Sequence, residues 1–256
     1  MPVLYIMKKI LLICFFICLF KYLPATTIVI YITPDFVIMA ADSKAVYTNA
    51  KTFKQTSEIV SKIYKSGNTY FSLAGLTLNE TQLFNVAKIA DTEFKNTGNI
   101  NAAVKKIKAA VSDALLQYLI NQKKTNTVLF KKNIAAEKYI TSIGIVTIKN
   151  NKPYTHLIGF IVTDTQQLKI RTEEEEYTSG SKRDAVYYLG TSGEINRYIN
   201  TIRSNNSDPV RFVEKLMNLQ VSKTPDLVSP PIDIIKITPK ETVWVRRKKG
   251  TPVEFE

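Results

Sequence analysis

The sequence predicts an α+β fold in which two β-sheets are covered by helices on their outer faces. The apolar patterns along the chain occur in the order strands, two helices, strands, two helices, strands. Hydrophobic residues make up 45% of the 256 residues, which allows a sizeable core. After residue 25 no internal repeat and no linker is visible, so we expect one domain over residues 26–256.

Four strands are expected at the start of this domain. Thr27–Ile32 is rich in β-branched residues, and Thr33-Pro34-Asp35 is a turn signal before the apolar run Phe36–Ala41. These two runs predict a hairpin. Ile59–Tyr64 and Thr69–Ala74 predict two further strands.

Two helices are expected next. The first has its apolar face within Leu83–Phe94. In the second, apolar residues recur every three or four positions over Ile100–Leu119, and Asn99 is a plausible cap. Lys123–Lys132 is polar and basic, so we expect a loop there.

The second half of the chain repeats this alternation. An acidic run, Glu173–Glu176, is expected to be a solvated face or loop, because no convergent ligands that would complete a metal site are evident. Asp208 and Pro209 are suitable as the cap and the first residue of a helix. The remaining expected elements are strands at Tyr139–Ile148, Pro153–Thr163, Leu168–Arg171, Ile232–Ile237 and Thr242–Arg246, and a helix at Glu194–Ile202.

Residues 1–25 have the features of a signal peptide. Lys8 and Lys9 precede the uninterrupted apolar run Ile10–Phe20, and Ala25 is a small residue before the expected cut. The run is short for a membrane-spanning helix, which needs about 20 apolar residues. We therefore expect a secreted or periplasmic protein with no stable membrane anchor after cleavage. An uncleaved anchor and lipid attachment remain as alternatives.

Cysteine and histidine usage narrows the possible chemistry. Both cysteines, Cys14 and Cys18, lie in the leader, so residues 26–256 offer no disulfide, thiolate metal site or cysteine nucleophile. The single histidine, His156, lies in an apolar stretch and is expected to be a strand residue. We expect no metal and no cofactor.

The net charge is +13, but the basic residues are scattered. The one dense basic run is Arg246–Lys249, and no nucleic-acid-binding motif accompanies it. Nucleic acid is therefore not an expected partner.

A hydroxyl group becomes a useful nucleophile only when a base removes its proton. A free α-amino group has an ordinary pKa of about 7.7–8.0 and can serve as that base. Cleavage after Ala25 would give Thr26 both groups. Asp42 and Lys62, at the ends of predicted strands, could tune the amine, and Gly75 could supply a backbone donor to an oxyanion.

The order and spacing of four segments resemble the opening of a proteasome β-type subunit: Thr26–Val29, Val37–Lys44, Lys62–Tyr64 and Leu73–Gly75. This resemblance implies an N-terminal-nucleophile (Ntn) hydrolase with a four-layer αββα sandwich and peptide-bond hydrolysis. It implies that the first threonine is the nucleophile and that the aspartate and lysine are its charged partners. It also implies that the amide of the glycine lines the oxyanion hole.

The resemblance continues near the C-terminus. Gly190–Gly193 resembles the family's serine-bearing turn, which would place Ser192 near the terminal amine, and Asp226–Ser229 resembles its distal Asp-x-x-Ser. Two prolines follow Ser229 where glycines are usual, and a signal peptidase would replace the family's self-removing propeptide. The resemblance also assigns three residues to substrate binding, with an apolar specificity pocket: Thr27, Lys44 (where arginine is usual) and Leu73.

Three functions remain open from the sequence. The first is an exported threonine peptidase. The second is an amidase of the same fold that acts on a small amide. The third is an inactive scaffold, or an anchored form whose Thr26 amine is blocked by the leader. The expected partners are a peptide or amide substrate and, because members of the family stack into rings, further copies of the chain.

Overall fold

The computed structural model describes residues 26–48, 55–78, 84–178, 184–201 and 208–248. The leader, and with it the signal-peptide prediction, lies outside the described residues. Among the described helices none is both long and apolar enough to cross a membrane.

The described strands form two five-stranded antiparallel sheets and one two-stranded antiparallel sheet. The first sheet has the order β10 (Ala185–Gly190), β1 (Thr27–Ile32), β2 (Val37–Ala41), β11 (Asp233–Ile237) and β12 (Thr242–Arg246). The second sheet has the order β5 (Ile63–Ser66), β6 (Thr69–Gly75), β7 (Lys138–Lys149), β8 (Lys152–Asp164) and β9 (Lys169–Thr178). The small sheet pairs β3 (Lys44–Thr48) with β4 (Gln55–Ile59).

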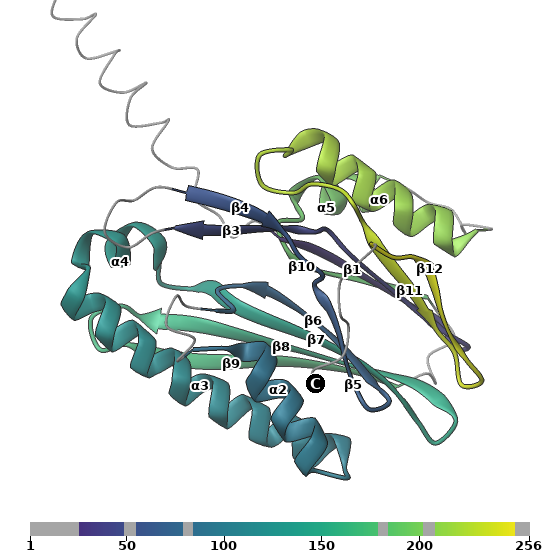
Figure 1. The fold of residues 1–256 in the computed structure, drawn as a ribbon, viewed down its shortest axis with the longest axis horizontal. Helices are drawn as coiled ribbons and strands as arrows, with labels where there is room; N and C mark the ends of the chain where they lie inside the picture. Colours follow the sequence, from purple (N-terminus) through teal and green to yellow (C-terminus); the bar gives the residue numbers. More distant parts are fainter. Residues whose placement is uncertain (1–25, 49–54, 79–83, 179–183, 202–207, 249–256) are drawn as a thin grey trace, which may run out of the picture.

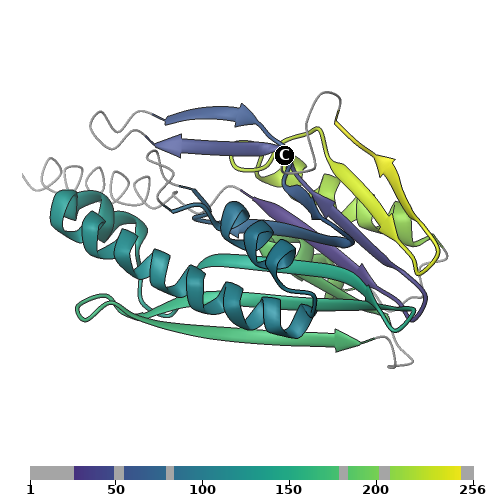
Figure 2. The same ribbon diagram turned by 60° about the horizontal axis from the view of Figure 1, so that its bottom comes forward.

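Helices pack against the outer faces of both large sheets (Figure 1). On the second sheet lie α2 (Val86–Asn96), α3 (Ile100–Thr125) and α4 (Thr127–Asn133). On the first sheet lie α5 (Gly193–Ile199) and α6 (Pro209–Lys223). The inner faces of the two large sheets meet across an apolar cluster, which contains Ile28 and Ile30 from β1 and Val146 from β7. Figure 2 shows α2 and α3 lying across the outer face of the second sheet.

The predicted β1–β2 hairpin is confirmed. Residues 28–32 pair with residues 37–41 in antiparallel register, and every residue of both strands is buried. Burial on both faces follows from the position of the hairpin, because Ile28 faces the second sheet while Val29 faces the helices. This explains why the two strands are apolar throughout rather than alternating.

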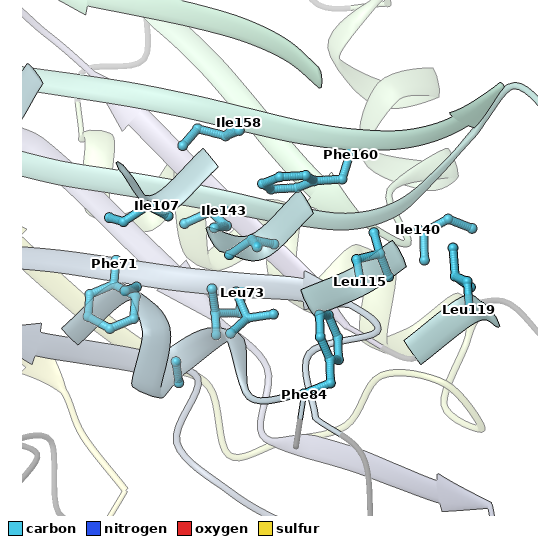
Figure 3. Packing of buried hydrophobic residues seen from close by; sticks show 14 of the residues in the cluster. Phe71, Leu73, Phe84, Ile107, Leu115, Leu119, Ile140, Ile143, Ile158 and Phe160 are labelled. Carbon is cyan, nitrogen blue, oxygen red and sulfur yellow. The ribbon is translucent and has the colours of Figure 1, made fainter. Parts of the chain in front are cut away.

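Helix α3 was also predicted from its periodicity. Its buried residues, Val104, Ile107, Val111, Leu115 and Leu119, follow helical spacing and pack on the second sheet. Figure 3 shows Ile107, Leu115 and Leu119 among the side chains of this core. The Asn99 side chain accepts hydrogen bonds from the N–H groups of Asn101 and Ala102, which confirms the predicted cap.

The predicted four-layer αββα sandwich is wrong for this chain. The described part is rich in strands, and these form three antiparallel sheets rather than two. The additional sheet is formed by β3 and β4, which pair with each other after the chain leaves β2. Without an apolar alternation they gave no signal in the sequence.

Two further local predictions need correction. Lys123–Lys132 is not a loop, since α3 continues to Thr125 and α4 follows. The Phe130 side chain is buried in the core, and Lys123 Nζ donates to the carbonyl oxygen of Gln166 at 2.7 Å. The predicted strand Ile59–Tyr64 is instead the end of β4, a three-residue connection and the start of β5.

The cap of α3 gives a testable prediction. Asn99→Ala is expected to lower the free energy of unfolding by about 1 kcal/mol, because two N–H groups of the first turn lose their acceptor. Asn99→Asp keeps an acceptor and should cost less. Urea unfolding of both variants and the wild type measures the differences. An Asn99→Ala variant as stable as the wild type would contradict the role of the cap.

Candidate active site

Thr26 is held in place by its backbone. It lies immediately before β1 and is only 8% exposed. The N–H of Thr191 donates to the carbonyl oxygen of Thr26 at 2.7 Å. Gly190 has a φ of +77° and passes so close that a Cβ atom there would lie 2.2 Å from the same oxygen. A glycine is therefore needed at position 190, and the turn after β10 fixes the start of β1.

Asp42 follows β2 directly, so the hairpin brings it beside the start of β1. Its carboxylate is fully buried and accepts the N–H of Thr27 at 2.8 Å and the N–H of Lys44 at 3.0 Å. The N–H of Asp42 donates to the carbonyl oxygen of Thr27 at 3.1 Å. These bonds supply the hydrogen-bond donors that a buried carboxylate needs.

Lys62 completes the group from a third element, the connection before β5. Its Nζ donates to Thr26 Oγ1 at 3.0 Å and to Asp42 Oδ1 at 2.9 Å, and the residue is only 5% exposed. The structure thus brings together the three residues to which the sequence assigned the central chemistry. The Lys62 ammonium group lies between the Thr26 hydroxyl and the Asp42 carboxylate and contacts both.

Burial is the largest influence on both charged groups. It raises the pKa of Asp42 and lowers the pKa of Lys62, while the attraction between the two opposes each shift. A charge in this water-poor environment acts strongly on its neighbours. Lys62 can therefore stabilise negative charge that develops on Thr26 Oγ1, and it can disfavour a second positive charge nearby.

A groove of about 1070 Å³ reaches the turn that contacts Thr26, although Thr26, Asp42 and Lys62 are not themselves among the residues that line it. Gly75 and Ser192, two residues of the predicted catalytic set, line it together with Thr191. Gly75 has a φ of +88°, and a Cβ atom there would lie 2.1 Å from the carbonyl oxygen of Ile140. Ser192 precedes α5, and its hydroxyl donates to the carbonyl oxygen of Gly190 at 3.4 Å. The groove therefore extends from the turn that holds Thr26.

The segment with Asp226 and Ser229 is tied to the residues that follow Asp42. Lys44 Nζ donates to the carbonyl oxygen of Asp226 at 2.6 Å, and the N–H of Ser43 donates to the carbonyl oxygen of Ser229 at 3.2 Å. These contacts use the backbone of the distal segment. The Asp226 side chain is exposed, and catalytic roles for Asp226 and Ser229 stay predictions.

Two of the predicted substrate-binding residues have structural contacts. Thr27 is fully buried, and its hydroxyl donates to the carbonyl oxygen of Thr191. Leu73 packs in the core between the second sheet and its helices, where Figure 3 shows it with Phe71 and Leu115. Leu73 is not among the residues that line the groove. Its neighbour Ala74, on the opposite face of β6, is among them.

Sequence reasoning missed the role of Thr191. Its N–H donates to the carbonyl oxygen of Thr26, and its own carbonyl oxygen accepts the hydroxyl proton of Thr27. Because these are backbone groups, the side chain at position 191 carried no signal. The motif Gly190–Gly193 was noticed only for its serine, although its first glycine makes the closest approach to Thr26.

The acidic run continues strand β9 rather than forming a loop. His156 lies in β8, as predicted, and is buried, with Nε2 3.0 Å from Glu174 Oε2 and Nδ1 3.1 Å from the hydroxyl of Tyr154. Within the described ranges no group of three or more His, Cys, Asp or Glu residues is placed to hold a metal ion.

Comparison with known proteins gives little to add to this geometry. No family model matches the chain, and no curated protein matches it. Among solved structures, it is similar to the Anbu (Gly-1) mutant from Hyphomicrobium sp. strain MC1. The sequence identity is 15%, the match covers 87% of this chain and 86% of that chain, and the TM-score is 0.49.

These results correct the family assignment drawn from the motifs. Membership in the proteasome β-type or Ntn hydrolase family is not supported, because no family model and no curated sequence matches. The similarity to Anbu is too distant in sequence and too low in TM-score to establish either a family or an activity. Any function must therefore be argued from the contacts of the site itself.

The buried ion pair gives a second testable prediction. Lys62→Met is expected to lower the free energy of unfolding by about 3–5 kcal/mol, because Asp42 stays buried without its cationic partner. As a control, Lys106→Met removes an exposed pair with Glu93 and should cost at most about 1 kcal/mol. Urea unfolding measures both.

The loss in Lys62→Met should also depend on pH. Without Lys62 the largest influence that opposes burial is lost, and only the hydrogen bonds from the N–H groups of Thr27 and Lys44 still lower the pKa of Asp42, so the folded-state pKa lies further above the unfolded one. A raised folded pKa gives stability that is lost as the pH rises through it. The variant should therefore be less stable, relative to the wild type, at about pH 8 than at about pH 5. A pH-independent difference would contradict this account.

Proposed function

We propose that this protein is an exported hydrolase that cleaves peptide bonds, with Thr26 as its nucleophile. The observation that carries the proposal is the contact of Lys62 Nζ with both Thr26 Oγ1 (3.0 Å) and the buried Asp42 carboxylate (2.9 Å). An ammonium group held against a hydroxyl oxygen favours loss of the hydroxyl proton. The proposal does not depend on membership of any family.

The base in this mechanism is the α-amino group of Thr26, which cleavage after Ala25 would free. The amine takes the Oγ1 proton as Oγ1 attacks the carbonyl carbon of the substrate. The amine then gives the proton to the leaving amine as the C–N bond breaks, which leaves an ester on Thr26. Water hydrolyses the ester, with the amine again taking and returning a proton.

The other predicted residues would act around this centre. Gly75 and Ser192 both line the groove, so an N–H of Gly75 is a candidate donor to the oxyanion, and Ser192 a candidate partner of the amine. The single histidine offers no alternative base, because both its ring nitrogens are engaged by Tyr154 and Glu174. The groove of about 1070 Å³ has room for either an extended peptide or a small amide, so the choice between them rests on the assay below.

Localisation and assembly belong to the same proposal. The leader would direct export, and its removal would create the base, so the protein would become active only outside the cytoplasm. Self-association into a homo-oligomer also stays a prediction. Size-exclusion chromatography with light scattering on the exported protein would test it.

The proposed mechanism gives a third testable prediction. Thr26→Ala should lower kcat/KM by at least about 10³-fold, because both attack and ester formation need Oγ1. Thr26→Ser keeps a hydroxyl and an amine and should retain measurable turnover. Cleavage of an unbiased peptide library by the exported protein, followed by mass spectrometry, provides the assay.

The proposed mechanism also requires that the active protein begins at Thr26, because the free α-amino group of Thr26 is the base. Intact-mass measurement after treatment with an epoxyketone, which reacts with an N-terminal threonine, should show an adduct on the wild type and none on Thr26→Ala. An active protein with a different first residue would overturn the assignment of the base. If small amides were cleaved and peptides were not, the amidase alternative would replace the peptidase.

A further inference from the structure

The groove beside Thr26 is acidic, although the chain as a whole carries a net charge of +13. Five glutamates line it, against a single lysine, Lys138: Glu137, Glu173, Glu174, Glu175 and Glu194. Carboxylates therefore outnumber cations among the residues that line the groove, on a protein that is basic as a whole.

Most of these carboxylates already have cationic partners. Arg171 contacts both Glu137 and Glu173, and Lys108 pairs with Glu174. Arg197 pairs with Glu194. Within the described ranges Glu175 forms no ion pair, so its charge is the one left for a ligand.

Glu175 lies on the inner face of the second sheet. It pairs in register with Leu157 of β8, and Glu173 pairs with Gly159. Cross-strand partners point to the same face, and Leu157 belongs to the cluster between the two large sheets. The side chain of Glu175 is therefore on the groove side of β9, whereas Glu174 faces α3 through its contact with Lys108.

Aromatic groups flank this carboxylate. Tyr139 and Tyr187 both line the groove. The pKa of Tyr139 is raised to about 12, chiefly by its hydrogen bond to Glu173, with a further contribution from the charge of Glu175. Burial raises the pKa of Tyr187, and the charge of Glu175 adds to this. Both tyrosines line the same groove as Glu175, and an aromatic face near a carboxylate is a favourable site for a cation.

The groove also follows a sheet edge. Strand β10 pairs with β1 on one side and is the outermost strand of the first sheet. Consecutive residues from Val186 to Glu194 line the groove, so it follows β10 up to the turn that holds Thr26. An extended peptide can add to such an edge through its backbone and place alternate side chains into a groove.

We propose that the groove binds an extended peptide segment with a cationic side chain, lysine or arginine, and that Glu175 recognises this side chain. The inference rests on the proposed function only in treating the bound peptide as the substrate. The contacts around Thr26 do not define which peptides are cleaved, and the inference specifies peptides with a lysine or arginine side chain.

Binding to the Thr26→Ala protein tests the inference without catalysis. The probes are fluorescently labelled extended peptides that differ only in one central residue: lysine, norleucine or glutamate. The lysine peptide is expected to bind about fivefold or more tightly than the norleucine peptide, and the preference should shrink as salt is added. Fluorescence anisotropy measures the affinities.

Glu175→Gln in the same background should abolish the preference for lysine. The matched control is Glu241→Gln, an exposed glutamate in the turn between β11 and β12, which should keep it. Equal affinities for the three peptides, or a preference that survives Glu175→Gln, would overturn the inference. So would a change of oligomeric state in Glu175→Gln, since the groove would then be an interface between copies.

Cleavage assays with wild-type Thr26 separate the two proposals. If the Thr26→Ala protein shows Glu175-dependent binding but the wild type cleaves nothing, the groove assignment stands and the hydrolase proposal fails. If the wild type cleaves norleucine and lysine peptides equally well and Glu175→Gln has no effect, the hydrolase stands and the groove assignment fails.

Discussion

The ion pair between Asp42 and Lys62 is the constraint on which the rest of the site depends. Two opposite charges lie in a nearly water-free interior, at a distance of 2.9 Å. Such a pair is tolerated only when hydrogen bonds satisfy the remaining polar groups. The N–H groups of Thr27 and Lys44, together with Thr26 Oγ1, provide these bonds. The same bonds that make the pair tolerable also position the hydroxyl group of Thr26.

Segments at the ends of strands in both large sheets supply these bonds. The β1–β2 hairpin places Asp42 beside the start of β1, and the connection into β5 brings Lys62 from the other sheet. The turn after β10 closes the arrangement with Gly190 and Thr191. Three segments distant in sequence thus meet where the two sheets face each other, and the apolar cluster between the inner faces holds the sheets in contact.

Regular periodicity explains which parts of the fold could be predicted. The β1–β2 hairpin consists of two continuous apolar runs, α3 repeats its apolar residues with the helical period, and both were found. The Asp208 side chain accepts the N–H of Arg211, so the cap of α6 was also found. The two strands of the small sheet and α4 show no regular apolar pattern, and β10, although it is an apolar run, was not predicted as a strand. Their absence from the prediction is why the layered architecture was described wrongly.

The chemistry of the site followed a similar rule. Thr26, Asp42 and Lys62 were selected because the motifs that contain them resemble those of a known family, and the structure brings the three residues together. The contacts made by Thr191 could not be selected, since a backbone group is the same at every residue. Leu73 was assigned to the binding pocket, but in β6 alternate residues face opposite ways, and Leu73 faces the helices. A one-residue difference along a strand decides whether a side chain reaches core or groove.

The backbone clamp on Thr26 and Thr27 has a consequence for maturation. Asp42 holds the N–H of Thr27 and Thr191 holds the carbonyl of Thr26, so β1 cannot slide along its neighbours. A leader cut one peptide bond too early would leave an extra residue and move the terminal nitrogen outward by about 3.8 Å, more than a hydrogen bond spans. Under the proposed function, the fidelity of the processing enzyme, and not only its presence, would then decide how many molecules carry the base.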